Sequence, residues 1–202
     1  MTNKTIEFYF DFLSPYGYLG SLGIEEIAKK HQLEVDWRPF LLGVTVMRVM
    51  GLPPVPDTPL KGPYAALDIP RTFAYRGVAH NPGPVRPYPP LPAGRAYTWL
   101  KDQDDGLAKR FAQTVYSAHW SEGRDVSTAH QLADVGHALG IDRDRLMASV
   151  SDSEVKTRHK QWVDLAVANG VFGAPTFVID GEMFWGSDKL EQVDAWIERG
   201  GW

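Results

Sequence analysis

Residues 5–16 read TIEFYFDFLSPY, and this stretch decides how the chain begins to fold. Apolar residues alternate with Glu7, Tyr9 and Asp11 through residues 5–12, which predicts a strand with those three residues on its other face. Residues 13–14 turn the chain, and Pro15 opens a helix expected to run to residue 31, since proline suits the first helical position. Residues 33–40, LEVDWRPF, predict a second strand.

The middle of the sequence is dominated by helical patterns and prolines. A short helix is expected over residues 41–50, and the proline-rich stretches 51–63 and 79–92 are expected to be loops on either side of a helix over 63–75. Residues 93–169 are helical almost throughout. Ser127 is expected to be a helix N-cap, residues 169–170 a helix end, and breaks are expected near Gly106, Gly123, Gly140 and Ser151.

Strand patterns return at the end of the chain. Residues 175–179 and 182–185 flank Asp180-Gly181, a strong signal for a tight hairpin. Ser187 is expected to cap a last helix. A strand–helix–strand half and a strand–strand–helix half, separated by helices, predict an α/β thioredoxin-like fold with a large α-helical insertion. Residues 1–40 and 170–202 would form the thioredoxin-like domain, and residues 41–169 the inserted helical domain.

Composition excludes several classes of function. The 202 residues carry a net charge of −4, which argues against nucleic-acid binding, and no apolar stretch approaches the length of a membrane helix. The chain has no cysteine, which excludes disulfides, a cysteine nucleophile and a dithiol redox couple. The six histidines show no metal-binding spacing, so no metal site is expected. Residues 1–10 lack the apolar core of a signal peptide, and a cytoplasmic location is the default expectation.

Ser14 lies where a strand turns into a helix. The N-terminus of a helix favours anions, so the Ser14 hydroxyl there is suited to donate a hydrogen bond to the thiolate of a bound ligand. The simpler interpretation is that Ser14 only caps the helix, and the serine alone favours that interpretation.

Two further motifs lie near the end of the chain. Ala174-Pro175 enters a strand; a cis bond there would leave the Ala174 backbone free to pair with an extended ligand, whereas a trans proline would simply end a loop. In Trp185-Gly186-Ser187-Asp188, a helix N-terminus with Ser187 suits a carboxylate and Asp188 suits an ammonium group. A plain helix cap explains these residues equally simply.

Together these motifs resemble those of one enzyme family. The stretches FYFDFLSPYGYLG (8–20) and GVFGAPTFVIDGEMFWGSDKL (170–190) resemble the 2-hydroxychromene-2-carboxylate isomerase family, as do WRPFLLG (37–43) and KGPYAALDIPR (61–71). That family is close to the kappa-class glutathione transferases and belongs to the DsbA-like branch of the thioredoxin superfamily. The matching stretches span nearly the whole chain.

The resemblance implies glutathione as the cofactor. It implies that Ser14 activates the glutathione thiol, as the catalytic residue. It also implies that Ala174, a cis Pro175 and the four residues Trp185, Gly186, Ser187 and Asp188 contact glutathione.

The substrate half of the site is less well matched. Arg48 occupies the place of a family lysine that binds the substrate carboxylate, and Lys61 and Arg71 are alternatives for that role; a solvated surface arginine is an equally good interpretation of Arg48. Leu52 replaces an asparagine common in the family and cannot make its hydrogen bonds. The loop after residue 79 also departs from the family pattern.

The sequence therefore predicts a glutathione-dependent isomerase that acts by reversible thiolate addition to a small aromatic conjugated ketone. By the same resemblance, a homodimer is expected. Two alternatives stay open: a kappa-like glutathione transferase or peroxidase, and a non-catalytic thioredoxin-like binding protein.

Overall fold

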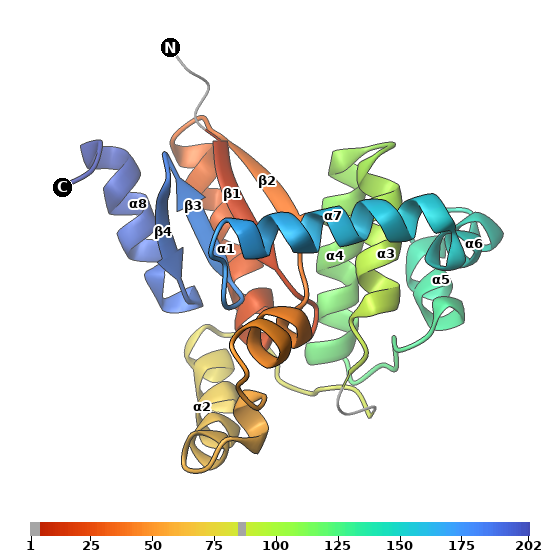
Figure 1. Ribbon diagram of the computed structural model, residues 1–202, viewed down its shortest axis with the longest axis horizontal. Helices are drawn as coiled ribbons and strands as arrows, with labels where there is room; N and C mark the ends of the chain where they lie inside the picture. Colours follow the sequence, from red (N-terminus) through yellow and green to blue (C-terminus); the bar gives the residue numbers. More distant parts are fainter. Residues whose placement is uncertain (1–4, 85–87) are drawn as a thin grey trace.

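Four strands form a mixed sheet in the computed structural model, which describes residues 5–84 and 88–202 (Figure 1). Strand β1 (Thr5–Phe10) is parallel to β2 (Glu34–Pro39) and antiparallel to β3 (Thr176–Ile179). Strand β4 (Glu182–Trp185) pairs with β3, giving the order β2-β1-β3-β4. The two ends of the chain thus share one sheet, as their strand patterns predict.

The two faces of β1 carry different neighbours. Ile6, Phe8 and Phe10 are fully buried in the main core, to which α1 (Pro15–Lys30) and α4 (Asp105–Trp120) contribute. Tyr9 points to the opposite face, into a smaller cluster that includes Ala166 and Val171. The alternation therefore separates two apolar surfaces rather than an apolar one from a polar one.

The first strand is shorter than the sequence predicts, and Asp11 lies outside it. The strand ends at Phe10, two residues earlier than expected, and Asp11 is 2% exposed. Its carboxylate accepts hydrogen bonds from the backbone N–H groups of Leu13 and Leu42, at 2.9 and 2.7 Å. These bonds keep the carboxylate in the interior, because they replace the contacts it would make with water.

The helical block over residues 91–168 has the breaks that its sequence predicts, with small shifts. The first break lies at 102–104 rather than at Gly106, and Thr128, not Ser127, is the N-cap of its helix. Thr128 displaces Ser127 because its side chain and that of Gln131 form a reciprocal capping box. The helices of the block are α3 (Leu91–Lys101), α4, α5 (Ala129–His137), α6 (Arg143–Ser151) and α7 (Ser153–Ala168).

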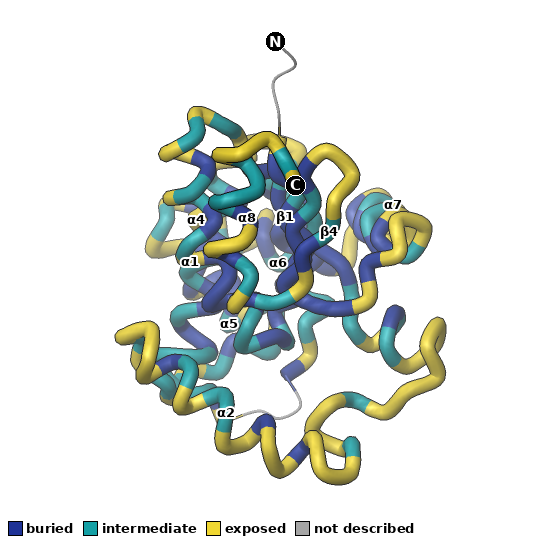
Figure 2. The backbone as a smooth tube through the Cα atoms, turned by 90° about the vertical axis from the view of Figure 1, so that its left-hand side faces the viewer, coloured by how far each residue is buried: buried dark blue, intermediate teal, exposed yellow. Residues whose placement is uncertain are grey.

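Residues 43–75 form an arm beside this body, comprising η1 (Gly43–Val49), η2 (Val55–Asp57) and α2 (Lys61–Tyr75). Figure 2 shows that much of α2 and its flanking segments is exposed. Large apolar side chains lie open on it, at exposed fractions of 87% for Leu60, 70% for Leu67 and 86% for Tyr75. The short helix expected over 41–50 is η1, which has the wide turns of a π-helix. The expected loops are shorter than predicted: α2 already begins at Lys61, and α3 begins at Leu91, because Pro92 suits the first turn of a helix. Residues 85–87 of the second loop lie outside the described residues.

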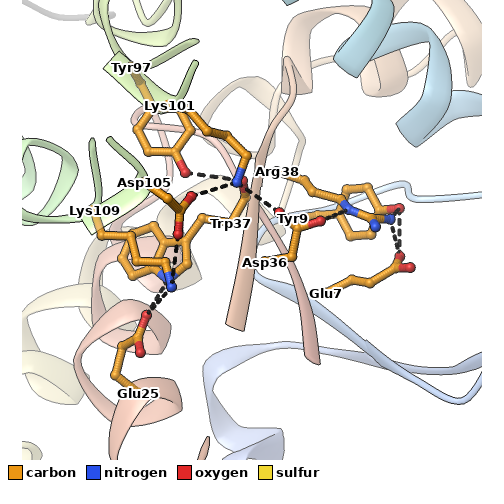
Figure 3. A network of polar contacts seen from close by, with 10 residues as sticks. All are labelled: Glu7, Tyr9, Glu25, Asp36, Trp37, Arg38, Tyr97, Lys101, Asp105 and Lys109. Carbon is orange, nitrogen blue, oxygen red and sulfur yellow. Dashed lines mark hydrogen bonds and ion pairs between the residues drawn. The ribbon is translucent and has the colours of Figure 1, made fainter. Parts of the chain in front are cut away.

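A chain of ion pairs joins the sheet to the helical block (Figure 3). Asp36 on β2 binds Arg38 at 2.7 Å and Lys101 of α3 at 2.8 Å, and Lys101 also binds Asp105 of α4 at 2.7 Å. Burial by itself raises the pKa of Asp36, but the hydrogen bonds from Lys101 and Arg38 outweigh it and hold that pKa below its ordinary value. The network therefore fixes α3 and α4 against the edge strand.

The last helix, α8 (Leu190–Arg199), follows a short 3₁₀ turn, η3 (Ser187–Lys189). The prediction that Ser187 caps this helix is wrong. Lys189 occupies the N-cap position without a side-chain hydrogen bond, and the Ser187 side chain is 4% exposed. The inserted turn moves the start of α8 past Ser187. The preceding hairpin forms as expected, with Asp180 and Gly181 both at positive φ.

Within residues 5–84 and 88–202, no helix is both long and apolar enough to cross a membrane. The same residues contain no group of three or more histidine, aspartate or glutamate side chains arranged to hold a metal ion.

Candidate functional site

Ser14 is both a helix cap and a contact between distant parts of the chain. Its Oγ accepts a hydrogen bond from the Gly17 N–H at 2.9 Å, which makes it the N-cap of α1, as the simpler interpretation predicts. The same hydroxyl donates to the Ala174 carbonyl oxygen at 2.8 Å. Ser14 is 4% exposed. A ligand anion would have to draw the hydroxyl proton away from Ala174 by rotation about the Cβ–Oγ bond.

One backbone donor at this turn remains for a ligand. Pro15 has no N–H, and the Gly17 N–H is already bound to Ser14. Among the described residues, none accepts a hydrogen bond from the Tyr16 N–H. The first turn of a helix leaves such donors unpaired and concentrates positive potential there, so the Tyr16 N–H and the Ser14 hydroxyl are the two donors at this turn that an anion could use.

The Ala174-Pro175 bond is cis, as the resemblance implies, and the trans interpretation is wrong. Pro175 continues the site toward β4, because its carbonyl accepts a hydrogen bond from the Gly186 N–H at 2.9 Å. The Ala174 N–H has no acceptor in the described part of the chain. This N–H is the backbone group that a bound peptide-like ligand can use.

Two aromatic side chains pack together close to Ala174 in the sequence. The Trp185 and Phe172 rings meet edge to face with centroids 4.9 Å apart, and the two side chains are 53% and 38% exposed. A Cβ at Gly173 would collide with the Trp185 indole, so only glycine lets the ring lie this close to the backbone. The pair offers an apolar surface two residues from Ala174.

Gly186, Ser187 and Asp188 follow this aromatic pair. Gly186 has φ +116, and a Cβ there would meet the Asp188 carboxylate, which explains the glycine. The Ser187 side chain faces inward, whereas the Asp188 side chain is 76% exposed. Lys189 Nζ lies 3.7 Å from an Asp188 oxygen. Of these three residues, Asp188 is the exposed one.

Asp11 supports the Ser14 turn from below. Besides the two bonds that its carboxylate accepts, its carbonyl oxygen accepts from the Ser14 N–H at 2.9 Å and from the Tyr116 hydroxyl at 2.8 Å. Burial raises the pKa of the Asp11 carboxyl to about 6, although the N–H groups of Leu13 and Leu42 oppose this shift. Asp11 thus ties the start of η1 to the turn that carries Ser14.

A second polar link joins the arm to α1. The Tyr16 hydroxyl donates to Asp68 of α2 at 2.6 Å, and Arg71 donates to the other carboxylate oxygen of Asp68, also at 2.6 Å. Burial and the adjacent Asp68 raise the pKa of Tyr16, whereas hydrogen bonds from Tyr16 and Arg71 lower the pKa of Asp68. Arg71 is therefore engaged within the arm.

The three cations predicted to bind substrate all lie on the arm. Arg48 is exposed on η1, Lys61 is exposed at the first residue of α2, and Arg71 is paired with Asp68. Among the described residues, no hydrogen bond or ion pair joins any of them to the Ser14–Ala174 group. Leu52, which replaces the family asparagine, is 49% exposed after η1, and its N–H donates to the Val46 carbonyl at 3.0 Å.

The structure thus brings Ser14, Ala174, Pro175 and Gly186 into one hydrogen-bonded group and leaves the predicted substrate cations on the arm. Sequence reasoning missed Asp11, Tyr16 and Asp68. An acidic residue inside the apolar run FYFDFL was the available signal for Asp11. No local pattern marks the pairing of Tyr16 with Asp68, since the two are 52 residues apart.

The chain matches known proteins along nearly its whole length. A family model for the DSBA-like thioredoxin domain matches residues 5–198. The chain is 25% identical over 204 residues to a 2-hydroxychromene-2-carboxylate isomerase of Sphingobium xenophagum, covering 96% of this chain and 98% of that protein. It is 28% identical over 209 residues to glutathione S-transferase kappa 2 of Caenorhabditis elegans, covering 94% and 90%.

A solved structure shows the same fold. The structure of a 2-hydroxychromene-2-carboxylate isomerase superposes with a TM-score of 0.85, at 24% identity and with 96% and 95% of the two chains covered. This similarity and the family match confirm the α/β thioredoxin-like fold expected from the order of strands and helices.

Proposed function

Because the chain belongs to the DSBA-like thioredoxin domain family, we propose that it is a glutathione-dependent isomerase of a small aromatic conjugated ketone. Similarity to a 2-hydroxychromene-2-carboxylate isomerase and to a kappa-class glutathione transferase supports the proposal. The observation that carries it is the Ser14 hydroxyl at the N-terminus of α1, 2.8 Å from the carbonyl oxygen of Ala174.

The hydrogen-bonding and charged groups of the site fit glutathione. The Ser14 hydroxyl and the Tyr16 N–H suit a thiolate, the free Ala174 N–H suits a peptide carbonyl, and the exposed Asp188 suits an ammonium group. When bound, glutathione would supply a thiolate that adds reversibly to the conjugated ketone and so allows a bond to rotate. The catalytic role of Ser14 is to stabilise that charge; Pro175, Trp185, Gly186 and the backbone of Ser187 shape the binding surface beside it.

The side chains around the site would divide the work among them. Ser14 turns its hydroxyl proton from the Ala174 carbonyl to the sulfur, while the Gly17 N–H keeps the oxygen in place. Asp11 holds the turn. The Phe172–Trp185 pair offers an aromatic surface on which a planar substrate can stack. The substrate carboxylate would be bound by Arg48 or Lys61, and by Arg71 only if it leaves Asp68.

The decisive experiment is calorimetric titration of reduced glutathione into the wild type and Ser14→Ala, together with an isomerase assay on an aromatic conjugated ketone. We expect both proteins to bind glutathione, turnover of the variant to fall about a hundredfold, and the buffer-dependent proton release to be lost. An active Ser14→Ala protein would refute the role of Ser14. No binding by the wild type at millimolar glutathione would instead favour a thioredoxin-like binding protein.

A kappa-like glutathione transferase or peroxidase remains the second candidate, because one of the similar proteins is a kappa glutathione transferase. The same assay separates the two enzymes by their products. An isomer with unchanged glutathione indicates the isomerase, whereas a stable glutathione conjugate indicates the transferase.

We further propose that the protein works as a homodimer in the cytoplasm, where reduced glutathione is abundant. The exposed Leu60, Leu67 and Tyr75 side chains of the arm support a second copy of the chain as the occupant of this surface. Sedimentation of the wild type and Leu67→Asp tests it: we expect a dimer and a monomer, respectively. A monomeric wild type would refute the homodimer, and cell fractionation tests the location.

A further inference from the structure

The end of the arm returns to the body of the protein at Arg76. This residue directly follows α2 and is exposed. Its Nη2 donates a hydrogen bond to the Ser187 carbonyl oxygen at 3.0 Å, across 111 residues of sequence. The guanidinium therefore lies at the surface beside the segment that carries Asp188.

The side chain that the sequence suggests for a carboxylate in this segment is buried. The Ser187 side chain is 4% exposed and faces inward, and α8 begins only at Leu190, without a side-chain cap. Asp188 provides a negative charge for an ammonium group. A ligand that carries both an ammonium and a carboxylate on one carbon also needs a positive partner here.

The guanidinium of Arg76 has the capacity to be that partner. A guanidinium has five N–H donors in a planar fork, and the Ser187 carbonyl occupies one nitrogen of this fork. The remaining donors match a carboxylate in a two-point geometry that an ammonium group cannot reproduce. Lys189 is the other nearby cation, but it already lies 3.7 Å from Asp188.

We propose that Arg76 binds the α-carboxylate of the γ-glutamyl end of glutathione, while Asp188 binds the ammonium group of the same carbon. The inference rests on the proposed use of glutathione and adds a residue to that site. It brings the end of the arm beside the binding site, because Arg76 directly follows Tyr75, the last residue of α2. The ligand would then be recognised as an α-amino acid at this end.

The test pairs a change in the protein with a change in the ligand. Calorimetry would measure the affinity of wild type, Arg76→Ala and Arg76→Lys for glutathione and for the glutathione analogue whose γ-glutamyl α-carboxylate is an amide. We expect Arg76→Ala to weaken glutathione binding at least about tenfold and to leave the affinity for the amide analogue unchanged. Arg76→Lys should lie between the other two proteins.

Controls separate recognition from support of the fold. Arg199→Ala, at the far end of α8, should bind both ligands as the wild type does, and urea unfolding would show whether Arg76→Ala remains folded. Equal weakening of both ligands would make Arg76 a structural tether and overturn the inference. A ligand-selective loss in Lys189→Ala but not in Arg76→Ala would assign the carboxylate to Lys189 and overturn it too.

The same titration distinguishes this inference from the proposed function. If the wild type binds glutathione and Arg76→Ala binds it equally well, only the role of Arg76 fails. If the wild type does not bind glutathione, both fail.

Discussion

The helical block and the arm differ in how many of their apolar side chains they bury against the rest of the molecule. The block contributes fully buried side chains, such as Tyr97 and Phe111, to the main core, and ion pairs from Asp36 and Lys101 hold it to the sheet. The arm exposes most of its large apolar side chains, although Phe73 of α2 is fully buried in the main core beside Tyr18. Polar bonds, among them Tyr16–Asp68 and Arg76–Ser187, add to its attachment. The block therefore contributes many more buried side chains than the arm, which leaves Leu60, Leu67 and Tyr75 exposed.

The largest contrast is expected between one apolar truncation in each region. Phe111→Ala should lower the free energy of unfolding by about 4 kcal/mol at every protein concentration, because it opens a cavity in the core. Leu67→Ala on the arm should lower the free energy of unfolding by less than about 0.5 kcal/mol in dilute protein, because the side chain is exposed. The loss should be larger only at concentrations where a dimer buries Leu67. Urea unfolding over a range of protein concentrations measures both.

If Leu67→Ala lowers the free energy of unfolding by more than about 1 kcal/mol at all protein concentrations, the contrast between the two regions is wrong. The arm would then be packed within a single chain. The circular dichroism spectrum of each variant serves as the control for folding.

His159 should make the block sensitive to acid. It lies on α7 and is 2% exposed, its Nδ1 is 3.1 Å from the Thr98 hydroxyl, and burial lowers its pKa from 6.5 to about 4. The unfolded chain binds a proton on this side chain more readily than the folded chain does. The stability contributed by neutral His159 is therefore present above pH 6.5 and is lost as pH falls toward 4, by about 3 kcal/mol.

The comparison of wild type with His159→Gln in urea at pH 7, 5.5 and 4 isolates this contribution, since the other groups cancel in the difference. We expect the stability of the variant relative to the wild type to rise as the pH falls. His137→Gln, at an exposed position on α5, is the matched control and should show no such trend. An equal pH trend in both variants would contradict the assignment to His159.

The ion-pair network should contribute less than the apolar core. Asp36→Asn removes the charge that Arg38 and Lys101 share, which should cost about 2 kcal/mol because the carboxylate is partly buried and doubly bonded. Asp164→Asn removes an exposed pair with Lys160 on α7 and should leave the urea midpoint unchanged. Equal effects of the two substitutions would show that the network adds nothing beyond a surface pair.

The smallest effect is expected at the attachment of the arm. Tyr16→Phe removes the hydroxyl that binds Asp68 and should weaken the attachment by about 1 kcal/mol, which corresponds to about fivefold faster tryptic cleavage in the arm. Tyr75→Phe, which changes an 86% exposed side chain, is the control. Unchanged cleavage after Tyr16→Phe would mean that other contacts hold α2 in place.

Local patterns predicted most elements but failed where polar groups are buried. The alternation in residues 5–12 predicted that Asp11 belongs to the strand, yet its carboxylate is buried after the strand end and is held there in part by the N–H of Leu42, which is 31 residues away. The Ser187 cap failed because a 3₁₀ turn precedes α8. The roles assigned to Ser14, Ala174, Trp185 and Asp188, and the domain boundaries after residues 40 and 169, remain predictions.

The sequence by itself determined the strands, the Asp180-Gly181 hairpin, the Ser14 cap and the absence of cysteine chemistry, because each depends on neighbouring residues or on composition. The tertiary structure alone decided that the Ser14 hydroxyl meets the Ala174 carbonyl across 160 residues, and that Arg76 meets Ser187 across 111. The physical reason is that such contacts follow from how the helices and strands pack, and short-range periodicity carries no information about which distant backbone groups will meet.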